Sequence, residues 1–331
     1  MTMENVIQPN RKYYNEITIA KGMGILLVVL GHAMKQTGVT DTAISVLLQL
    51  IYSFHMPLFF VLSGFVSIKI LRFTEVGEYF GYIKSRAFRL LIPYFVVGIL
   101  YMPLKYFLSR FARNPYDFSA AWKILLGENP NTTLWFLYTL FWVSVLALVL
   151  VRRTVSGPVL ILTAVLSAAA FAFSWEIRVL KYLFFFLLGL YLREHYERVL
   201  RWGTKKWCAA VLFLLFAGGN VLLYGGCSVA EFMTSVAGSG LCILLALWLL
   251  AKGAAPCAPL KKLGDGSMDV YILSDPVQTV FRLILWNILG LPNVLVILFC
   301  FAVGVIVSYV AAVILRRWRI FRVLLFGEYG E

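Results

Sequence analysis

The chain has 331 residues and a mean hydropathy of +0.84, and 61% of its residues are hydrophobic whereas only 14% are charged. This composition excludes an ordinary soluble domain and indicates a polytopic membrane protein. The formal net charge of +14 fits basic residues that flank membrane spans and attract anionic lipid, so no nucleic-acid partner is needed to explain it.

Ten apolar segments predict an all-α membrane helix bundle of about ten transmembrane helices. We expect residues 1–16 to form a cytoplasmic N-terminal segment, residues 17–315 a single transmembrane domain and residues 316–331 a cytoplasmic basic tail. The long connections are 70–89 and 109–132. The predicted spans are 17–35, 44–69, 90–108, 133–151, 157–174, 179–192, 207–224, 229–251, 267–289 and 291–315.

The distribution of basic residues predicts the orientation of the bundle. If the N-terminus lies in the cytoplasm, most of the 30 Lys and Arg residues fall at cytoplasmic helix ends, as the positive-inside rule requires. We therefore expect both termini inside and a multi-pass location in the cell membrane, here a bacterial plasma (inner) membrane. The five cysteines are scattered and odd in number, so neither a disulfide framework nor a metal site is expected.

The first predicted span contains a cation and an imidazole, Lys21 and His32, in an otherwise apolar run. Eleven positions make about three helical turns, so both side chains lie on one helix face about 16 Å apart along the axis. Such groups are costly in lipid and are expected to face protein or a water-filled cavity. The pair indicates a functional site that begins near the cytoplasmic face and ends near the outer face.

The second span contains His55, followed closely by Pro57. Proline has no backbone N–H, so it leaves a nearby carbonyl that a buried donor can use. Two interpretations of His55 follow: a structural histidine that satisfies the helix break, or a second catalytic histidine.

Two arginines, Arg86 and Arg89, precede the third span on its predicted cytoplasmic side. At a spacing of three they share a helix face. Their planar forks of donors suit the phosphates of a nucleotide-like cofactor. The alternative is a positive-inside anchor that contacts lipid headgroups.

The ninth span has a polar stripe formed by Tyr271, Asp275, Gln278 and Arg282, whose spacings place all four on one helix face. This stripe either lines a substrate cavity shared with the first span or forms an internal network that holds helices together. Gln278 is expected to bridge Asp275 and Arg282, or each of these takes a separate partner. Trp135, at the start of the fourth span, offers either a core contact or a platform for a sugar ring.

Three sequence runs together resemble the acyltransferase-3 family of integral membrane acyltransferases: Ile19–Ala33, Phe54–Phe65 and Arg86–Tyr94. Phe54–Pro57 and Leu134–Leu137 are most similar to the fucose 4-O-acetylase-like branch of that family. The resemblance extends over nearly the whole chain, and the combination of runs is more specific than any one of them.

The resemblance implies a membrane-bound O-acyltransferase. Family members move an acyl group, commonly acetyl, from cytoplasmic acyl-CoA to a hydroxyl of a carbohydrate or lipid-linked precursor at the far side of the membrane. By position, His32 is the catalytic histidine, Lys21 the basic residue of the family motif, and Arg86 and Arg89 are candidates for the CoA phosphates. The expected partners are thus acyl-CoA as co-substrate, a glycan acceptor and membrane lipid, with no permanently bound cofactor.

Two other classes of function compete with this one. A transporter or exporter of a glycan-like or small polar substrate would use the same polar stripe as a permeation path, although no repeated halves are visible in the sequence. A membrane module that binds a ligand without chemistry is the other. Within the acyltransferase interpretation, direct transfer and an acyl-histidine intermediate are both open.

Overall fold

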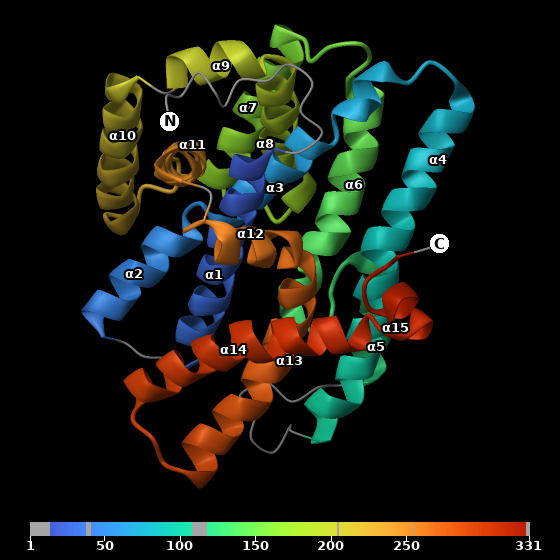
Figure 1. The fold of residues 1–331 in the computed structure, drawn as a ribbon, viewed down its shortest axis with the longest axis vertical. Coiled ribbons are helices and arrows are strands. Elements are labelled where there is room, and N and C mark those ends of the chain that lie inside the picture. Colours follow the sequence, from blue (N-terminus) through green and yellow to red (C-terminus); the bar gives the residue numbers. More distant parts are fainter. Residues whose placement is uncertain (1–13, 38–40, 108–117, 204, 254, 329–331) are drawn as a thin grey trace. The chain divides into compact units, whose positions relative to one another are not determined.

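The computed structural model describes residues 14–37, 41–107, 118–203, 205–253 and 255–328, and every regular element in them is helical (Figure 1). The predicted all-α fold is therefore confirmed. Among the described residues, seven helical segments are long and apolar enough to cross a membrane. They are Asn15–Thr37, Thr42–Arg72, Val76–Phe107, Thr132–Leu150, Lys206–Tyr224, Ala230–Lys252 and Asn293–Leu315.

All ten predicted spans coincide with helices, but three of these helices are not among the seven long segments. They are α7 (Gly157–Ala172), α8 (Arg178–Glu194) and α13 (Ser267–Leu283), of 16 or 17 residues each. α13 continues into the π-helical turn η7 (Ile284–Ile288). The number of crossings and the N-in/C-in orientation stay predictions.

Helices also occupy segments that were predicted as connections. α4 (Val76–Arg86), the π-helical turn η3 (Ala87–Leu91) and α5 (Ile92–Phe107) follow one another without a break. A capping box begins α4, in which the backbone N–H of Glu75 donates to Glu78 Oε2 at 3.1 Å. Most of the predicted connection 70–89 is thus helical. A search for apolar segments misses this helix, because a capping box and a polar helical pattern specify it instead.

The remaining unpredicted helices are short, namely α9 (Tyr196–Gly203), α12 (Ala258–Asp265) and α15 (Arg319–Leu324). α15 lies within the predicted basic tail 316–331, and Phe326 just after it is fully buried; the cytoplasmic location of this tail stays a prediction. The predicted N-terminal segment 1–16 lies largely outside the described residues, and α1 (Asn15–Thr37) begins within its last two positions.

The chain forms two compact units, which we describe separately. The first comprises the described parts of residues 1–28, 40–74 and 146–267. Within it, α3 (His55–Val66) and α8 touch through two glycines: a Cβ on Gly64 would lie 1.9 Å from the Phe186 carbonyl oxygen, and one on Gly189 would lie 2.0 Å from that of Val61. Only glycine permits this approach, so Gly64 serves helix packing, as its sequence context indicates.

The second unit comprises the described parts of residues 29–39, 75–145 and 268–331. It contains the last third of α1, helices α4 and α5, most of α6 (Trp135–Leu150), and α13, α14 (Asn293–Leu315) and α15.

The predicted connection 109–132 contains the 3₁₀-helix η5 (Phe118–Leu126) in its described part. Asn129 is buried and donates through Nδ2 to the carbonyl of Tyr94 at 2.8 Å, while the Tyr94 hydroxyl donates to the carbonyl of Ile124 at 3.0 Å. Asn129 also lies against Gly98 in the middle of α5. The connection therefore packs against α5, where its Asn129 amide satisfies an α5 carbonyl and the Tyr94 hydroxyl satisfies a carbonyl of the connection.

Candidate functional site

A partly buried polar cluster around the buried Asp275 joins the end of α1 to α13 within the second unit. Gln36 donates through Nε2 to Asp275 Oδ1 at 2.5 Å and accepts through Oε1 from Arg282 Nη1. The Asp275 side chain also faces Tyr101 of α5, whose hydroxyl lies 3.3 Å from Thr279 Oγ1. Three helices thus converge on one carboxylate.

The expected bridge through Gln278 is wrong. Gln278 is fully buried and donates through Nε2 to the carbonyls of Val29, at 2.9 Å, and Cys300, at 3.3 Å. It therefore fastens α13 to α1 and α14, and Gln36 makes the bridge instead. The reason is distance in the fold: Gln36 lies 239 residues from Asp275 in the sequence, so no local spacing indicates the pairing.

Tyr271 of the predicted stripe makes contacts that hold helices together. Its hydroxyl donates to the carbonyl of Thr133, and its ring packs edge-on against Phe136 at 5.7 Å. This contact ties α13 to the start of α6, where Trp135 is the first residue and packs edge-on against Phe136. The stripe thus contains both proposed roles: Tyr271 and Gln278 hold helices together, whereas Asp275 and Arg282 form the polar cluster.

His32 lies on α1 one helical turn before Gln36. Its side chain is partly exposed, whereas its neighbours Gly31 and Ala33 are buried. Residues four apart on a helix are neighbours on one face, so His32 lies next to the amide that joins Asp275 to Arg282. A cavity shared by the histidine of the first span and the stripe of the ninth stays a prediction, which this spacing on α1 supports.

Lys21 lies on the part of α1 that belongs to the first unit. It is partly exposed, and helix rise alone gives about 16 Å between it and His32 along α1. The next residue, Gly22, lies against α12, since a Cβ there would be 2.1 Å from the Leu260 carbonyl oxygen. The role of Lys21 at a cofactor stays a prediction.

His55 has structural contacts in the first unit. It is the first residue of α3, after the break that ends α2 (Thr42–Tyr52). Its Nδ1 lies 2.8 Å from the carbonyl oxygen of Ile51. Pro57 leaves the carbonyl of Ser53 without its helical donor, and the Ser235 hydroxyl donates to that carbonyl at 2.8 Å. The predicted helix break is present, and these contacts favour the structural interpretation of His55.

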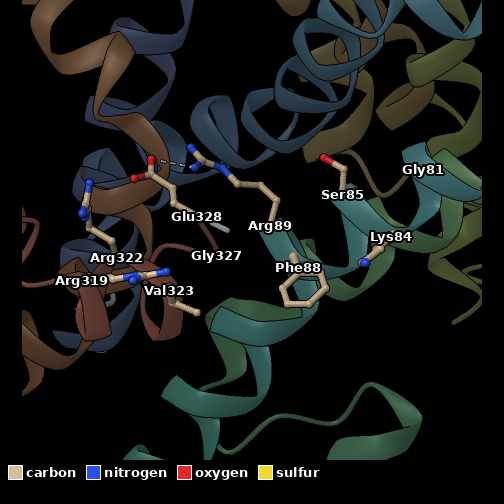
Figure 2. A pocket seen from close by; sticks show the side chains of 10 residues that line it. All are labelled: Gly81, Lys84, Ser85, Phe88, Arg89, Arg319, Arg322, Val323, Gly327 and Glu328. Atoms are coloured by element: carbon tan, nitrogen blue, oxygen red, sulfur yellow. Dashed lines mark hydrogen bonds and ion pairs between the residues drawn. The ribbon is translucent and has the colours of Figure 1, made fainter. Parts of the chain in front are cut away.

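A basic cavity of about 820 Å³ lies in the second unit (Figure 2). Lys84 and Arg89 line it from α4 and η3, and Arg319 and Arg322 line it from α15. Glu328 supplies the acidic side chain of the lining. This concentration of positive charge is suited to an anion.

The two arginines of the predicted pair have different surroundings. Arg89 lines the cavity, whereas Arg86 donates through Nε to the Tyr82 hydroxyl at 2.9 Å and places its guanidinium 5.1 Å from the centre of the Tyr82 ring. Arg86 is the last residue of α4 and Arg89 lies in η3, and a π-helical turn rotates less per residue than an α-helix. Of the pair, Arg89 is the one that lines the cavity, and a phosphate-binding role for either arginine stays a prediction.

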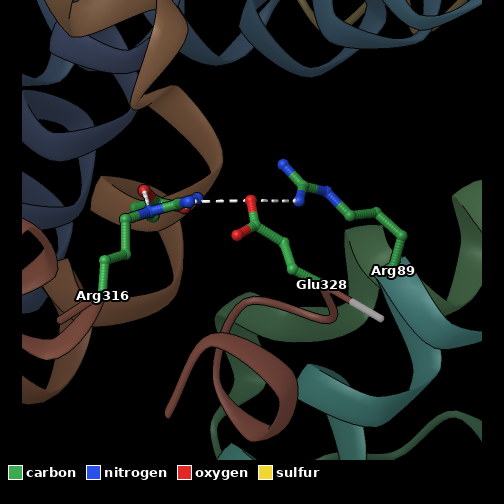
Figure 3. Close-up of polar contacts among 4 residues, drawn as sticks. Arg89, Arg316 and Glu328 are labelled. Atoms are coloured by element: carbon green, nitrogen blue, oxygen red, sulfur yellow. Dashed lines mark hydrogen bonds and ion pairs between the residues drawn. The ribbon is translucent and has the colours of Figure 1, made fainter. Parts of the chain in front are cut away.

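Glu328 connects the cavity to α13 through a chain of ion pairs (Figure 3). Its Oε1 accepts from Arg89 Nη1 at 3.0 Å and from Arg316 Nη1 at 2.7 Å, and Arg316 also binds both oxygens of Asp269 at 2.7 and 2.9 Å. Burial raises the pKa of the Glu328 carboxyl, but the hydrogen bonds from Arg316 and Arg89 outweigh it and lower the pKa overall. Glu328 is therefore a stable anion at neutral pH.

α13 runs from the cavity to the polar cluster. Asp269 lies at its beginning, beside Arg316, and Asp275 lies six residues further along. At 1.5 Å per residue these positions are about 9 Å apart along the axis. The second unit thus holds a basic cavity and a polar cluster beside His32. The helix α13 connects the two, because it carries both Asp269 and Asp275.

Comparison with known proteins identifies the family. A family model described as an acyltransferase domain, that of the acyltransferase-3 family, matches residues 14–313. The chain belongs to this acyltransferase-3 family. No curated protein and no solved structure matches the chain.

The acyltransferase-3 match includes Lys21, His32, Arg89 and Asp275 but ends before α15. Membership of this family indicates that the chain is a membrane acyltransferase, in agreement with its apolar helices. Sequence reasoning missed several residues of these two sites. Of these, Gln36 had a usable signal in its spacing of four from His32, whereas Tyr101, Arg319, Arg322 and Glu328 are brought in by tertiary structure alone.

Proposed function

We propose that this chain is an O-acyltransferase, of the fucose 4-O-acetylase-like branch, that moves an acetyl group from cytoplasmic acetyl-CoA to a hydroxyl of a cell-surface carbohydrate or its lipid-linked precursor. The observation that carries the proposal is the position of His32 one turn from Gln36, which joins Asp275 and Arg282. A histidine beside a buried carboxylate and a partly buried guanidinium is a setting for proton transfer rather than for packing.

The proposed reaction uses the imidazole of His32 as a base. It accepts the proton of the acceptor hydroxyl while the hydroxyl oxygen attacks the thioester carbonyl carbon. The carbon–sulfur bond breaks, and the CoA thiolate leaves and takes up the proton, giving an ester and free CoA. In the two-step alternative the imidazole nitrogen first takes the acyl group, and the acceptor hydroxyl then removes it.

The polar cluster is the proposed place for the acceptor. Carboxylate, amide and phenol groups are the side chains that hold sugar hydroxyls, and Asp275, Gln36 and Tyr101 supply one of each. Under the predicted orientation this end of α13 is the outer end. A carbohydrate presented at the outer face would therefore meet His32 from that side.

The basic cavity is the proposed place for the donor phosphates. Arg89 gives one Nη1 hydrogen bond to Glu328 and is partly exposed, so its guanidinium fork is accessible to a ligand. Under the predicted orientation the cavity lies on the cytoplasmic side, where acyl-CoA is available. With the phosphates there, the arm that carries the thioester would follow α13 toward His32.

The test is acyl transfer by purified protein in nanodiscs, with radiolabelled acetyl-CoA and a panel of glycan acceptors. We expect label to pass to a glycan, and His32→Ala to lower the rate by about 10²–10⁴-fold, the usual cost of losing a general base. His195→Ala is the matched control, because His195 caps α8 and contacts the Tyr191 carbonyl of its own helix.

Near-wild-type transfer by a folded His32→Ala variant would reject this histidine as the base. Movement of an acceptor across the membrane without any new ester would instead favour the transporter alternative.

A further inference from the structure

The wall of the basic cavity formed by α15 lies outside the part of the chain that the family model matches. Arg319 and Arg322 come from this helix and face the cavity across from Lys84 (Figure 2). Resting on the proposed function, we infer that Arg319 and Arg322 bind phosphate groups of the acyl donor, with Lys84 on the opposite side.

The charge balance of the cavity supports an anionic ligand. Glu328 is shared between Arg89 and Arg316 through a single carboxylate oxygen. Neither Arg319 nor Arg322 has an ion-pair partner among the described residues. Two guanidinium groups on one short helix without a counter-ion repel each other, and a bound phosphate would remove that repulsion.

The atoms of the Arg322 guanidinium differ in their access to a ligand. Arg322 Nε is buried and has no hydrogen-bond partner in the part of the chain that the structure describes. A buried N–H without an acceptor is costly. Since Nε is inaccessible, a ligand in the cavity would meet the terminal amino groups of Arg322, and such groups of an arginine bind phosphate oxygens.

The shape of the cavity favours a nucleotide-like donor. Its volume of about 820 Å³ lies within the range of pockets that hold drug-sized ligands, about 300–1,000 Å³. Phe88 also lines it and offers an aromatic ring beside the basic groups, which suits a nucleobase.

A second source of phosphate is the headgroup of an anionic lipid. α15 exposes Trp318 and Ile320 just before and among its arginines, a composition that also suits a membrane surface. The shared chemistry is phosphate binding by Arg319 and Arg322, and the experiment separates the two sources.

The experiment measures equilibrium binding of CoA and of pantetheine to the full chain in zwitterionic nanodiscs. Arg319→Gln and Arg322→Gln should each weaken CoA binding about ten-fold, as expected for loss of a charge-assisted hydrogen bond. Pantetheine has no phosphate and should bind equally to the wild type and both variants. Arg317→Gln is the matched control, since it removes a positive charge next to α15 from a residue outside the cavity lining, and it should leave CoA binding unchanged.

A second arm adds phosphatidylglycerol to the nanodiscs and measures its retention by native mass spectrometry. Unchanged CoA affinity in both variants, together with loss of phosphatidylglycerol retention, would assign the arginines to lipid and overturn the inference. Equal loss in Arg317→Gln would overturn it as well, because the effect would then be general charge.

The two proposals fail in different ways. CoA binding that depends on Arg319 and Arg322, in a protein that transfers no acyl group to any acceptor, would keep the phosphate site and reject the acyltransferase function. Acyl transfer with wild-type CoA affinity in both variants would keep the function and reject the role of α15.

Discussion

At the scale of single residues, Gln36 matters because an amide both donates and accepts. Its Nε2 donates to Asp275 and its Oε1 accepts from Arg282. Gln36→Glu keeps the size but places a carboxylate against the Asp275 carboxylate, which should cost about 1–3 kcal/mol of stability through a lost donor. The measurement is the thermal unfolding midpoint of the purified protein.

The control for Gln36→Glu is a compensating exchange. In the double variant Gln36→Glu with Asp275→Asn, the new asparagine can donate to the new glutamate, and Arg282 keeps its acceptor. We expect the double variant to recover most of the lost midpoint. A midpoint as low as that of Gln36→Glu alone would contradict the bridge.

Glu328 is the residue-scale counterpart at the cavity. Its carboxylate occupies Arg89 and adds negative charge where donor phosphates are proposed to bind. Glu328→Gln should therefore lower the KM for acetyl-CoA by about three- to ten-fold, the effect expected when one charged hydrogen bond of Arg89 is released. Glu128→Gln is the matched control, because the exposed Glu128 pairs with Lys123.

The affinity of the cavity for CoA should depend on pH through Glu328, and the direction follows from its pKa. The pKa of Glu328 is lowered in the folded protein, so its ion pairs are fully present above the unfolded pKa and are lost as pH falls through the folded pKa. CoA affinity of the wild type should approach that of Glu328→Gln over this acidic range, which a binding titration at stepped pH measures. A constant ratio between the two proteins would mean that Glu328 does not compete with the donor.

At the scale of elements, the contact of α3 with α8 depends on glycine. Gly64→Ala would place a Cβ 1.9 Å from the Phe186 carbonyl oxygen, so the helices must separate. We expect a loss of at least about 1–3 kcal/mol, the usual cost of overpacking, seen as a lower thermal midpoint. Gly218→Ala in α10 (Lys206–Tyr224) is the matched control, since nothing lies within 4 Å of the new atom, and there the midpoint should stay or rise.

Long apolar helices were predictable because hydropathy and length are local properties. The π-helical turn η3 and the short helices α9, α12 and α15 were not, since they depend on capping and on surfaces that only the folded chain provides. The same division applies to the site. The sequence indicates the site residues that are polar groups in or beside apolar spans, namely His32, Asp275, Arg282 and Arg89. It does not indicate the roles of Gln36 and Glu328, because each of these binds a partner 239 residues away.

At the scale of the whole molecule, polar residues of the second unit pair with residues predicted on the same side of the membrane. Arg89, Asp269, Arg316 and Glu328 are all predicted at the cytoplasmic side, and they pair with one another. Gln36 is predicted at the outer side and pairs with Arg282, which is predicted within the ninth span. The contacts thus agree on which residues share a side, and a labelling experiment decides which side is cytoplasmic.

A native cysteine can report this orientation. Cys227 is exposed in the turn between α10 and α11 (Ala230–Lys252), a turn predicted to face outward, whereas Cys242, Cys257 and Cys300 are buried. A membrane-impermeant maleimide should therefore label the wild type in intact cells, and Cys227→Ser should lose that label.

The matching inward reporter is Thr154→Cys in a background without native cysteines. Thr154 is exposed beside Arg152 and Arg153, in a turn that the positive-inside rule places in the cytoplasm. It should react only after permeabilisation. Labelling of Thr154→Cys in intact cells, with Cys227 protected, would put the basic cavity on the outer side. Acyl-CoA is made in the cytoplasm, so the donor could not reach Arg89 and the proposed transfer across the membrane would be excluded.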